Sequence, residues 1–198
     1  MYSPRWVSSF SSTVSDAPRV GDDPMVIHTL PIGAGNCHLL QCPSENKLIV
    51  FDCGSTGAGD QNWDENDVQN YVNNLIDDDT DIVVTVSHAN TDHYNYLPDL
   101  FADSDQVSTI AIGQQLGNYS VDFRNWVNDL TGNHNANLWW SAGQYSSNGN
   151  ENWLSCWAPD GHGGWDLDVA GEILVVDAGA TANDQSMVVQ MDYQQFST

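Results

Sequence analysis

Residues 83–95 decide the fold, and they read VVTVSHANTDHYN. The first four residues are apolar or β-branched, which is typical of a short buried strand. Polar residues follow from Ser87, so we expect the strand to end there. Two His and one Asp then lie close together in the sequence: His88, Asp92 and His93. A loop at the end of a strand can direct three such side chains toward one point.

The residue types in this loop predict a metal site. Imidazole nitrogens and carboxylate oxygens are the ligands of zinc and related first-row metals. We therefore interpret His88, Asp92 and His93 as candidate metal ligands. The competing interpretation, an ordinary hydrogen-bonded histidine, explains a single His more easily than two His and an Asp in one loop.

The loop also resembles the metal motif of the metallo-β-lactamase superfamily, which usually reads His-x-His-x-Asp-His. Here Asn90 stands at the second His. This shortened form, with Leu97-Pro98 after it, is similar to the metallo-β-lactamase domains of DNA-uptake competence proteins. Three further stretches resemble parts of the same family in the same order, namely residues 32–40 (IGAGNCHLL), 48–55 (LIVFDCGS) and 183–191 (NDQSMVVQM).

The resemblance implies an α/β fold, a metallo-β-lactamase-like αββα sandwich with mixed sheets. The resemblance ends at Thr198. In the family, a strand that ends in Asp and a final His would follow, so we expect a domain that is incomplete at its C-terminus. The pattern of strands and helices along the chain independently favours the α/β class.

The resemblance also implies roles for single residues. Asp92 would orient an attacking water and so be the catalytic residue. Asp52 would lie beneath the loop and accept a hydrogen bond from a ligand's other nitrogen, with Asn90 beside the ligands; a helix N-cap is the alternative role for Asp52. His162 is a candidate further ligand, although its Gly-rich surroundings favour a plain turn. Zinc is the expected metal, with manganese or no metal as alternatives.

Hydrophobic periodicity predicts the remaining elements. Helices are expected at 67–76, 96–101 and 121–130. Residues 1–23 show little periodicity and are expected to form an N-terminal arm, which leaves 24–198 as the domain. Strands are expected at 25–30, 37–41, 47–51, 83–86, 107–112, 153–158, 173–176 and 187–191.

Acidity is the most unusual feature of the composition. Lys and Arg total 4 against 27 Asp and Glu, a formal net charge of -23. Such a chain repels nucleic-acid phosphates and attracts divalent cations, so nucleic acid is disfavoured as a partner. The acidity favours a secreted or salt-exposed location. We recognise no signal peptide and no apolar run long enough to span a membrane.

The four cysteines leave two interpretations open. Cys37 and Cys42 lie on one expected strand, five positions apart, so their side chains face opposite sides and cannot bond to each other. The even number of cysteines permits disulfides, and buried free thiols are the other interpretation.

Two functions therefore remain open. The first is a metal-dependent hydrolase acting on an ester, amide or phosphodiester; the competence proteins imply a phosphodiester, which the charge disfavours. The second is a non-catalytic acidic protein that uses the fold for cation binding or for self-association through the N-terminal arm. Asn90 favours the second because it removes one imidazole from the usual metal motif.

Overall fold

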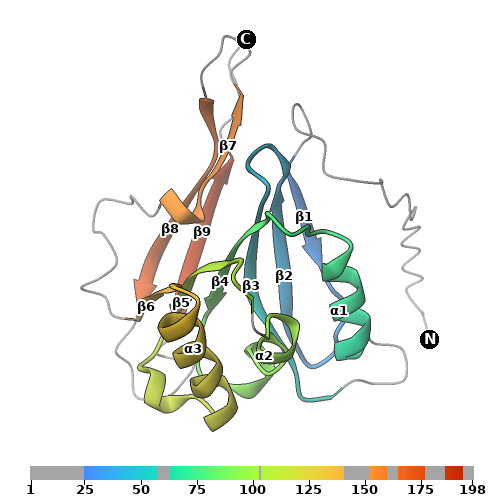
Figure 1. The fold of residues 1–198 in the computed structure, drawn as a ribbon, viewed down its shortest axis with the longest axis vertical. Helices are drawn as coiled ribbons and strands as arrows, with labels where there is room; N and C mark the ends of the chain where they lie inside the picture. The colour runs from blue at the N-terminus through green and yellow to red at the C-terminus, as the bar shows by residue number, and fades with distance from the viewer. Residues whose placement is uncertain are drawn as a thin grey trace, which may run out of the picture.

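The computed structural model describes residues 25–57, 63–102, 104–140, 152–159, 165–176 and 186–193. The predicted arm, residues 1–23, lies outside the described residues. Within them the chain forms two sheets and three α-helices (Figure 1). None of these helices has the length and apolar character needed to cross a membrane.

The larger sheet is mixed. Its strands are, in spatial order, β1 (Val26–Thr29), β2 (Gly35–Cys42), β3 (Lys47–Ser55), β4 (Asp81–Val86), β5 (Val107–Ile112) and β6 (Asn137–Trp139). Strands β1 to β3 pair antiparallel, whereas β3 to β6 pair parallel. The smaller sheet is antiparallel and consists of β7 (Cys156–Pro159), β8 (Trp165–Val176) and β9 (Met187–Tyr193).

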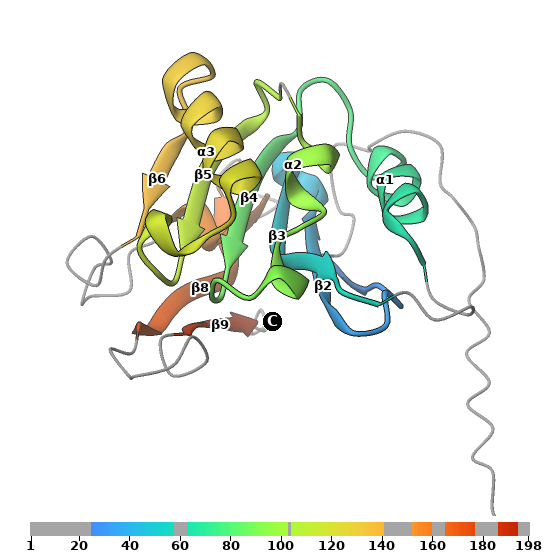
Figure 2. The same cartoon turned by 90° about the horizontal axis from the view of Figure 1, so that it is seen from below.

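The α-helices cover one face of the larger sheet, and the smaller sheet covers the other (Figure 2). The helices are α1 (Glu65–Asn73), α2 (Leu97–Leu100) and α3 (Val121–Asn133). Four short 3₁₀ helices join the strands: η1 (Pro43–Glu45), η2 (Thr91–His93), η3 (Leu116–Asn118) and η4 (Asn152–Leu154). These layers confirm the predicted α/β class; the larger sheet is mixed as predicted, whereas the smaller sheet is antiparallel.

The central strand β4 is buried on both faces because its side chains alternate between two cores. Val84 and Val86 pack toward the helices, and Val83 packs toward the smaller sheet. All three are fully buried. A strand buried in this way needs an apolar run without polar alternation, which is the pattern seen in the sequence.

Several predicted boundaries were wrong. Helix α1 begins at Glu65, because Asp64 caps it and forms a capping box with Asp67. Trp153 belongs to η4, so the strand expected from that residue begins only at Cys156. Strand β6 was not predicted: its three residues carry too weak a signal and are stabilised by pairing with β5.

Both pairs of cysteines form disulfides, so the interpretation as buried free thiols was wrong. Cys37 bonds Cys53 across β2 and β3, and Cys42 bonds Cys156 between the two sheets. Cys37 lies in the core beneath the helices, whereas Cys42 lies in the core between the sheets. The predicted opposite orientation of these two side chains is therefore confirmed. Disulfides are typical of proteins that fold in an oxidising compartment.

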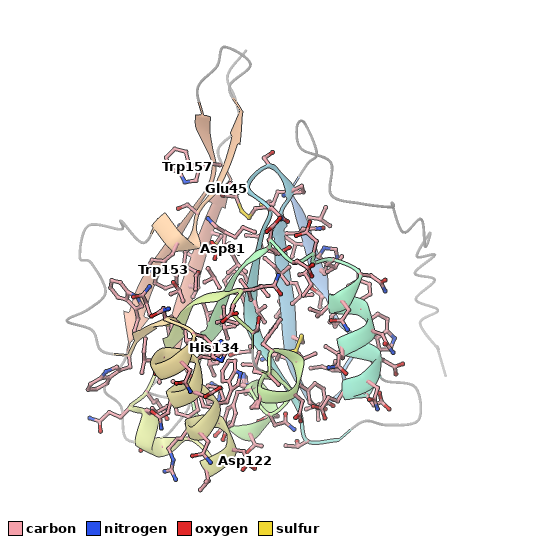
Figure 3. The ribbon with its side chains drawn as sticks, in the orientation of Figure 1. Glu45, Asp81, Asp122, His134, Trp153 and Trp157 are labelled. Atoms are coloured by element: carbon pink, nitrogen blue, oxygen red, sulfur yellow. A yellow bond between two sulfur atoms is a disulfide. The ribbon has the colours of Figure 1, made fainter. Side chains whose placement is uncertain are left out.

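Polar contacts reinforce the second disulfide where the smaller sheet meets η1. The buried Lys47 Nζ donates to the Ser155 carbonyl at 3.0 Å. The Trp157 backbone N–H donates to Glu45 Oε2 at 2.9 Å, and Figure 3 shows both residues at this junction. Lys47 also contacts the Glu45 carboxylate at 3.3 Å, so one buried cation joins the two sheets.

Candidate functional site

The candidate site lies at the C-terminal ends of β3 and β4, which run parallel and side by side. Asp52, near the end of β3, has a φ of 51°, in the left-handed region that few residues other than Gly adopt. The pairing of β2 with β3 is irregular between Cys37 and His38, opposite this position. The Asp52 carboxylate contacts the first residue after β4, which is Ser87.

Asp52 accepts three hydrogen bonds from the loop that follows β4. The Ser87 backbone N–H donates to Oδ1 at 2.7 Å, and the Ser87 hydroxyl donates to Oδ2 at 2.8 Å. His93 Nδ1 lies 2.8 Å from the same Oδ2. The predicted contact between Asp52 and this loop is therefore present. The alternative, Asp52 as a helix N-cap, was wrong because Asp64 caps α1.

These hydrogen bonds fix the tautomers of both histidines. A carboxylate only accepts hydrogen bonds, so His93 Nδ1 carries a proton, and the lone pair of the neutral ring is on Nε2. The Ser87 hydroxyl gives its proton to Asp52, so it accepts from His88 Nδ1 at 2.9 Å, and that ring's lone pair is also on Nε2. The hydrogen bond to Asp52 raises the pKa of His93, while burial opposes the shift.

The three predicted ligands lie in one cluster. The ring centroids of His88 and His93 are 4.0 Å apart, and His93 Nε2 is 4.0 Å from Asp92 Oδ2. Two imidazoles and a carboxylate have the chemistry that zinc requires. Within the described residues, however, no three His, Cys, Asp or Glu side chains are positioned to hold a metal ion. His162, the further candidate, lies outside the described residues.

The loop is held against β3 by a side chain that the sequence analysis missed. Asn95 Oδ1 accepts from the Ser55 backbone N–H at 2.8 Å, and its Nδ2 donates to the Ser55 carbonyl at 3.0 Å. The Tyr96 N–H donates to the Cys53 carbonyl at 3.2 Å. Gly54 permits this approach, because a Cβ there would lie 2.4 Å from Asn95 Oδ1. Asn95 thus extends the hydrogen bonding of β3 into the loop.

Ser87 was missed as a contributor to the site, and Asn90 contributes through its backbone. Ser87 was interpreted only as the end of the strand, although its hydroxyl links Asp52 to His88. The Asn36 side chain lies beside the His93 ring, with Nδ2 3.4 Å from Nδ1, but it does not donate to that protonated nitrogen. The Asn90 carbonyl accepts from the His93 N–H at 3.0 Å as η2 begins.

A cavity of about 380 Å³ lies next to this polar cluster, between the two sheets. Asp52 and Ser87 form part of its wall. The other lining residues are Met25 and residues of β1 to β4 and β9, and most of them are apolar. The full set is Met25, Ile27, His38, Leu40, Phe51, Thr85, Met187, Val189 and Met191. The candidate site therefore has an apolar chamber on one side.

Comparisons with known proteins assign neither a family nor an activity. No family model matches the chain, and no curated protein matches it. Among solved structures the chain is similar to human tRNase Z, short form, with 16% sequence identity and a TM-score of 0.41. The match covers 84% of this chain and 64% of the human chain. The likeness is too low to support an argument about function.

Proposed function

We propose that the cluster at the end of β4 is the site of a metal-dependent hydrolase that resembles the metallo-β-lactamase superfamily. The bond cleaved would be an ester, an amide or a phosphodiester. The observation that supports the proposal is the 2.8 Å hydrogen bond between Asp52 and His93. Metal-binding histidines are typically held by a carboxylate on the nitrogen that does not face the metal.

His88, Asp92 and His93 would hold the ion, and zinc suits them best. When bound, the ion would polarise the scissile bond and lower the pKa of a water molecule. Side-chain rotations would be needed, because the three groups do not converge on one point as they stand. The Nε2 lone pairs of both rings favour such a rearrangement, since Nε2 is the nitrogen that would face the ion.

The chain's own residues would perform the remaining tasks. Asp52 and Ser87 keep both histidine rings oriented through the contacts described above. The Asp92 side chain is one-third exposed, so it can accept a hydrogen bond from an attacking water and orient it. Asn95 keeps the loop against β3, which limits the movement of the ligands.

Charge favours a small substrate that is not a polyanion. Two of the chain's four cationic residues, Lys47 and Arg124, lie in the described part. Lys47 is buried and bonded within the protein. A phosphodiester backbone would therefore meet little positive charge on the described surface.

The test is elemental measurement of zinc in the purified full chain, with hydrolysis assays on p-nitrophenyl acetate and bis-p-nitrophenyl phosphate. We expect about one zinc ion per chain, with zinc and turnover lost in His88→Ala and Asp92→Ala. His134→Ala is the matched control, because His134 contacts Asp105 in the loop before β5 and Asp129 on α3.

The control should retain both zinc and activity. A wild-type chain that binds neither zinc nor manganese and turns over neither substrate would refute the proposal. That result would favour the non-catalytic alternative, an acidic protein that binds cations or self-associates.

A further inference from the structure

We propose that the cavity between the two sheets is a binding site for a small apolar molecule that carries no negative charge. The inference goes beyond the proposed hydrolase function, because it requires neither a metal ion nor catalysis. It is carried by the shape of the cavity, the residues that line it and the charge at its polar end.

The cavity arises from a mismatch between the two sheets. The larger sheet has six strands and the smaller has three, and β9 is an edge strand of the smaller sheet. Strands β1 and β2 therefore extend past β9 (Figure 2). Ile27 of β1 is 66% exposed at this overhang, although it lines the cavity. The cavity therefore results from the different widths of the two sheets and not from a single small side chain in the core.

The two sheets are fixed at both ends of the gap, so it cannot close by a simple shift. At one end the Met187 backbone N–H donates to the Ser87 carbonyl at 2.7 Å. At the other end the Cys42–Cys156 disulfide and Lys47 join β2 and β3 to the smaller sheet. Protein interiors otherwise close-pack with few voids larger than a water molecule. A cavity that its walls hold open at this size is a candidate ligand site.

The volume and lining match those of small-molecule sites. Ligand pockets typically have volumes of about 300–1,000 Å³, mostly apolar walls and a few polar groups. The 380 Å³ cavity lies at the lower end of that range. Three methionines contribute to its wall, and methionine adapts its shape to irregular apolar ligands. The methionines are Met25, Met187 and Met191.

The polar end of the cavity selects against anions. It carries the Asp52 carboxylate in a chain of net charge -23. Asp52 already accepts three hydrogen bonds, and the Thr85 hydroxyl donates to the Val50 carbonyl at 3.0 Å. These groups are engaged within the protein, so a ligand would gain affinity chiefly from apolar burial. The occupant is therefore an apolar molecule, neutral or cationic.

The test uses the full chain and the neutral fluorescent probe N-phenyl-1-naphthylamine. Ile27→Asp places a charge on the exposed part of the wall and should weaken binding about tenfold, because an apolar probe would then desolvate a carboxylate. Val26→Asp is the matched control: Val26 is the adjacent residue of β1, 38% exposed, and does not line the cavity. It should bind the probe like the wild type. The anionic probe 1-anilinonaphthalene-8-sulfonate should bind more weakly than the neutral one.

If Ile27→Asp does not fold, a measurement on the wild-type chain tests the proposal. Methionine methyl groups labelled with ¹³C are followed by NMR while n-octanol is added. We expect the resonances of the three lining methionines to shift together with one saturation curve. The proposal would be overturned if the wild type did not bind the neutral probe, or if Ile27→Asp and Val26→Asp lost the same probe affinity. It would also be overturned if n-octanol did not shift the methionine resonances.

Discussion

Replacing Gly54 by Ala tests whether the histidine loop depends on close contact with β3. A Cβ added at Gly54 would lie 2.4 Å from Asn95 Oδ1, 2.7 Å from the Asn95 backbone nitrogen and 2.7 Å from the Tyr94 backbone nitrogen. Real Cβ atoms essentially never approach other heavy atoms within 3.0 Å. Two of the three contacts involve backbone atoms, so a side-chain rotation cannot relieve them. The loop must move away from β3.

The cost follows from the clash and from the hydrogen bonds that the movement strains. Overpacking costs about 1–3 kcal/mol, and the upper part of that range applies to backbone contacts. The two Asn95–Ser55 hydrogen bonds, at 2.8 and 3.0 Å, contribute about 1 kcal/mol each. Replacing Gly by Ala in a strand returns about 0.5–1 kcal/mol. We expect Gly54→Ala to lower the free energy of unfolding by about 3–4 kcal/mol.

The assay is urea unfolding followed by tryptophan fluorescence, with the midpoint and slope fitted for each variant. Gly117→Ala is the control, because a Cβ at that position meets no atom within 4 Å. Its unfolding free energy should stay within about 0.5 kcal/mol of the wild type. If Gly54→Ala unfolds at the same urea concentration as Gly117→Ala, the loop does not depend on this contact and the reasoning is wrong.

Three further predictions concern stability and use the same urea assay. Burial raises the pKa of Glu65 from its ordinary 4.5 to about 7. The stability contributed by the protonated carboxyl is therefore complete below about pH 4.5 and is lost as the pH rises through 7. Glu65→Gln should match the wild type at pH 4 and exceed it by about 1 kcal/mol at pH 8, once solvent screening is allowed for; equal stability at pH 8 would contradict this. Lys47→Met should cost about 2 kcal/mol because it leaves a buried carbonyl without its donor, whereas the control Arg124→Met should change stability by less than about 0.5 kcal/mol. Replacing Cys42 and Cys156 by Ala opens a loop with a sequence separation of 114 residues and should cost about 4 kcal/mol; a double variant that unfolds like the oxidised wild type would refute the role of this disulfide.

The central strand and its loop could be predicted because the signal is local. A β-branched run followed by Ser87 marks the end of β4 at Val86, as observed. The clustering of His88 with His93 was also accessible, since both follow one strand end. Asp52 was expected beneath the loop only through the family resemblance. Its left-handed conformation depends on irregular pairing with β2, which no local pattern in β3 reveals.

Features that depend on distant pairing could not be predicted. The Cys37–Cys53 disulfide requires the register of β2 against β3, in which these two residues are partners. Strand β6 forms because Trp139 pairs with β5, and the Trp139 ring lies 5.8 Å from that of Trp153. The hydrophobic pattern predicted a strand that begins at Trp153. Its position in η4 follows from contacts with residues far away in the sequence.

Because Lys47 is buried inside the protein, it adds no positive charge to the surface through which two copies of the chain would interact. With Lys47 enclosed, Arg124 is the one Lys or Arg side chain left outside the core of the described residues. Two such surfaces cannot neutralise each other with ion pairs of their own. Counterions must do so instead, and screening reaches only about 8–10 Å at physiological salt. Dissolved salt and multivalent cations should therefore weaken the repulsion between copies of this chain.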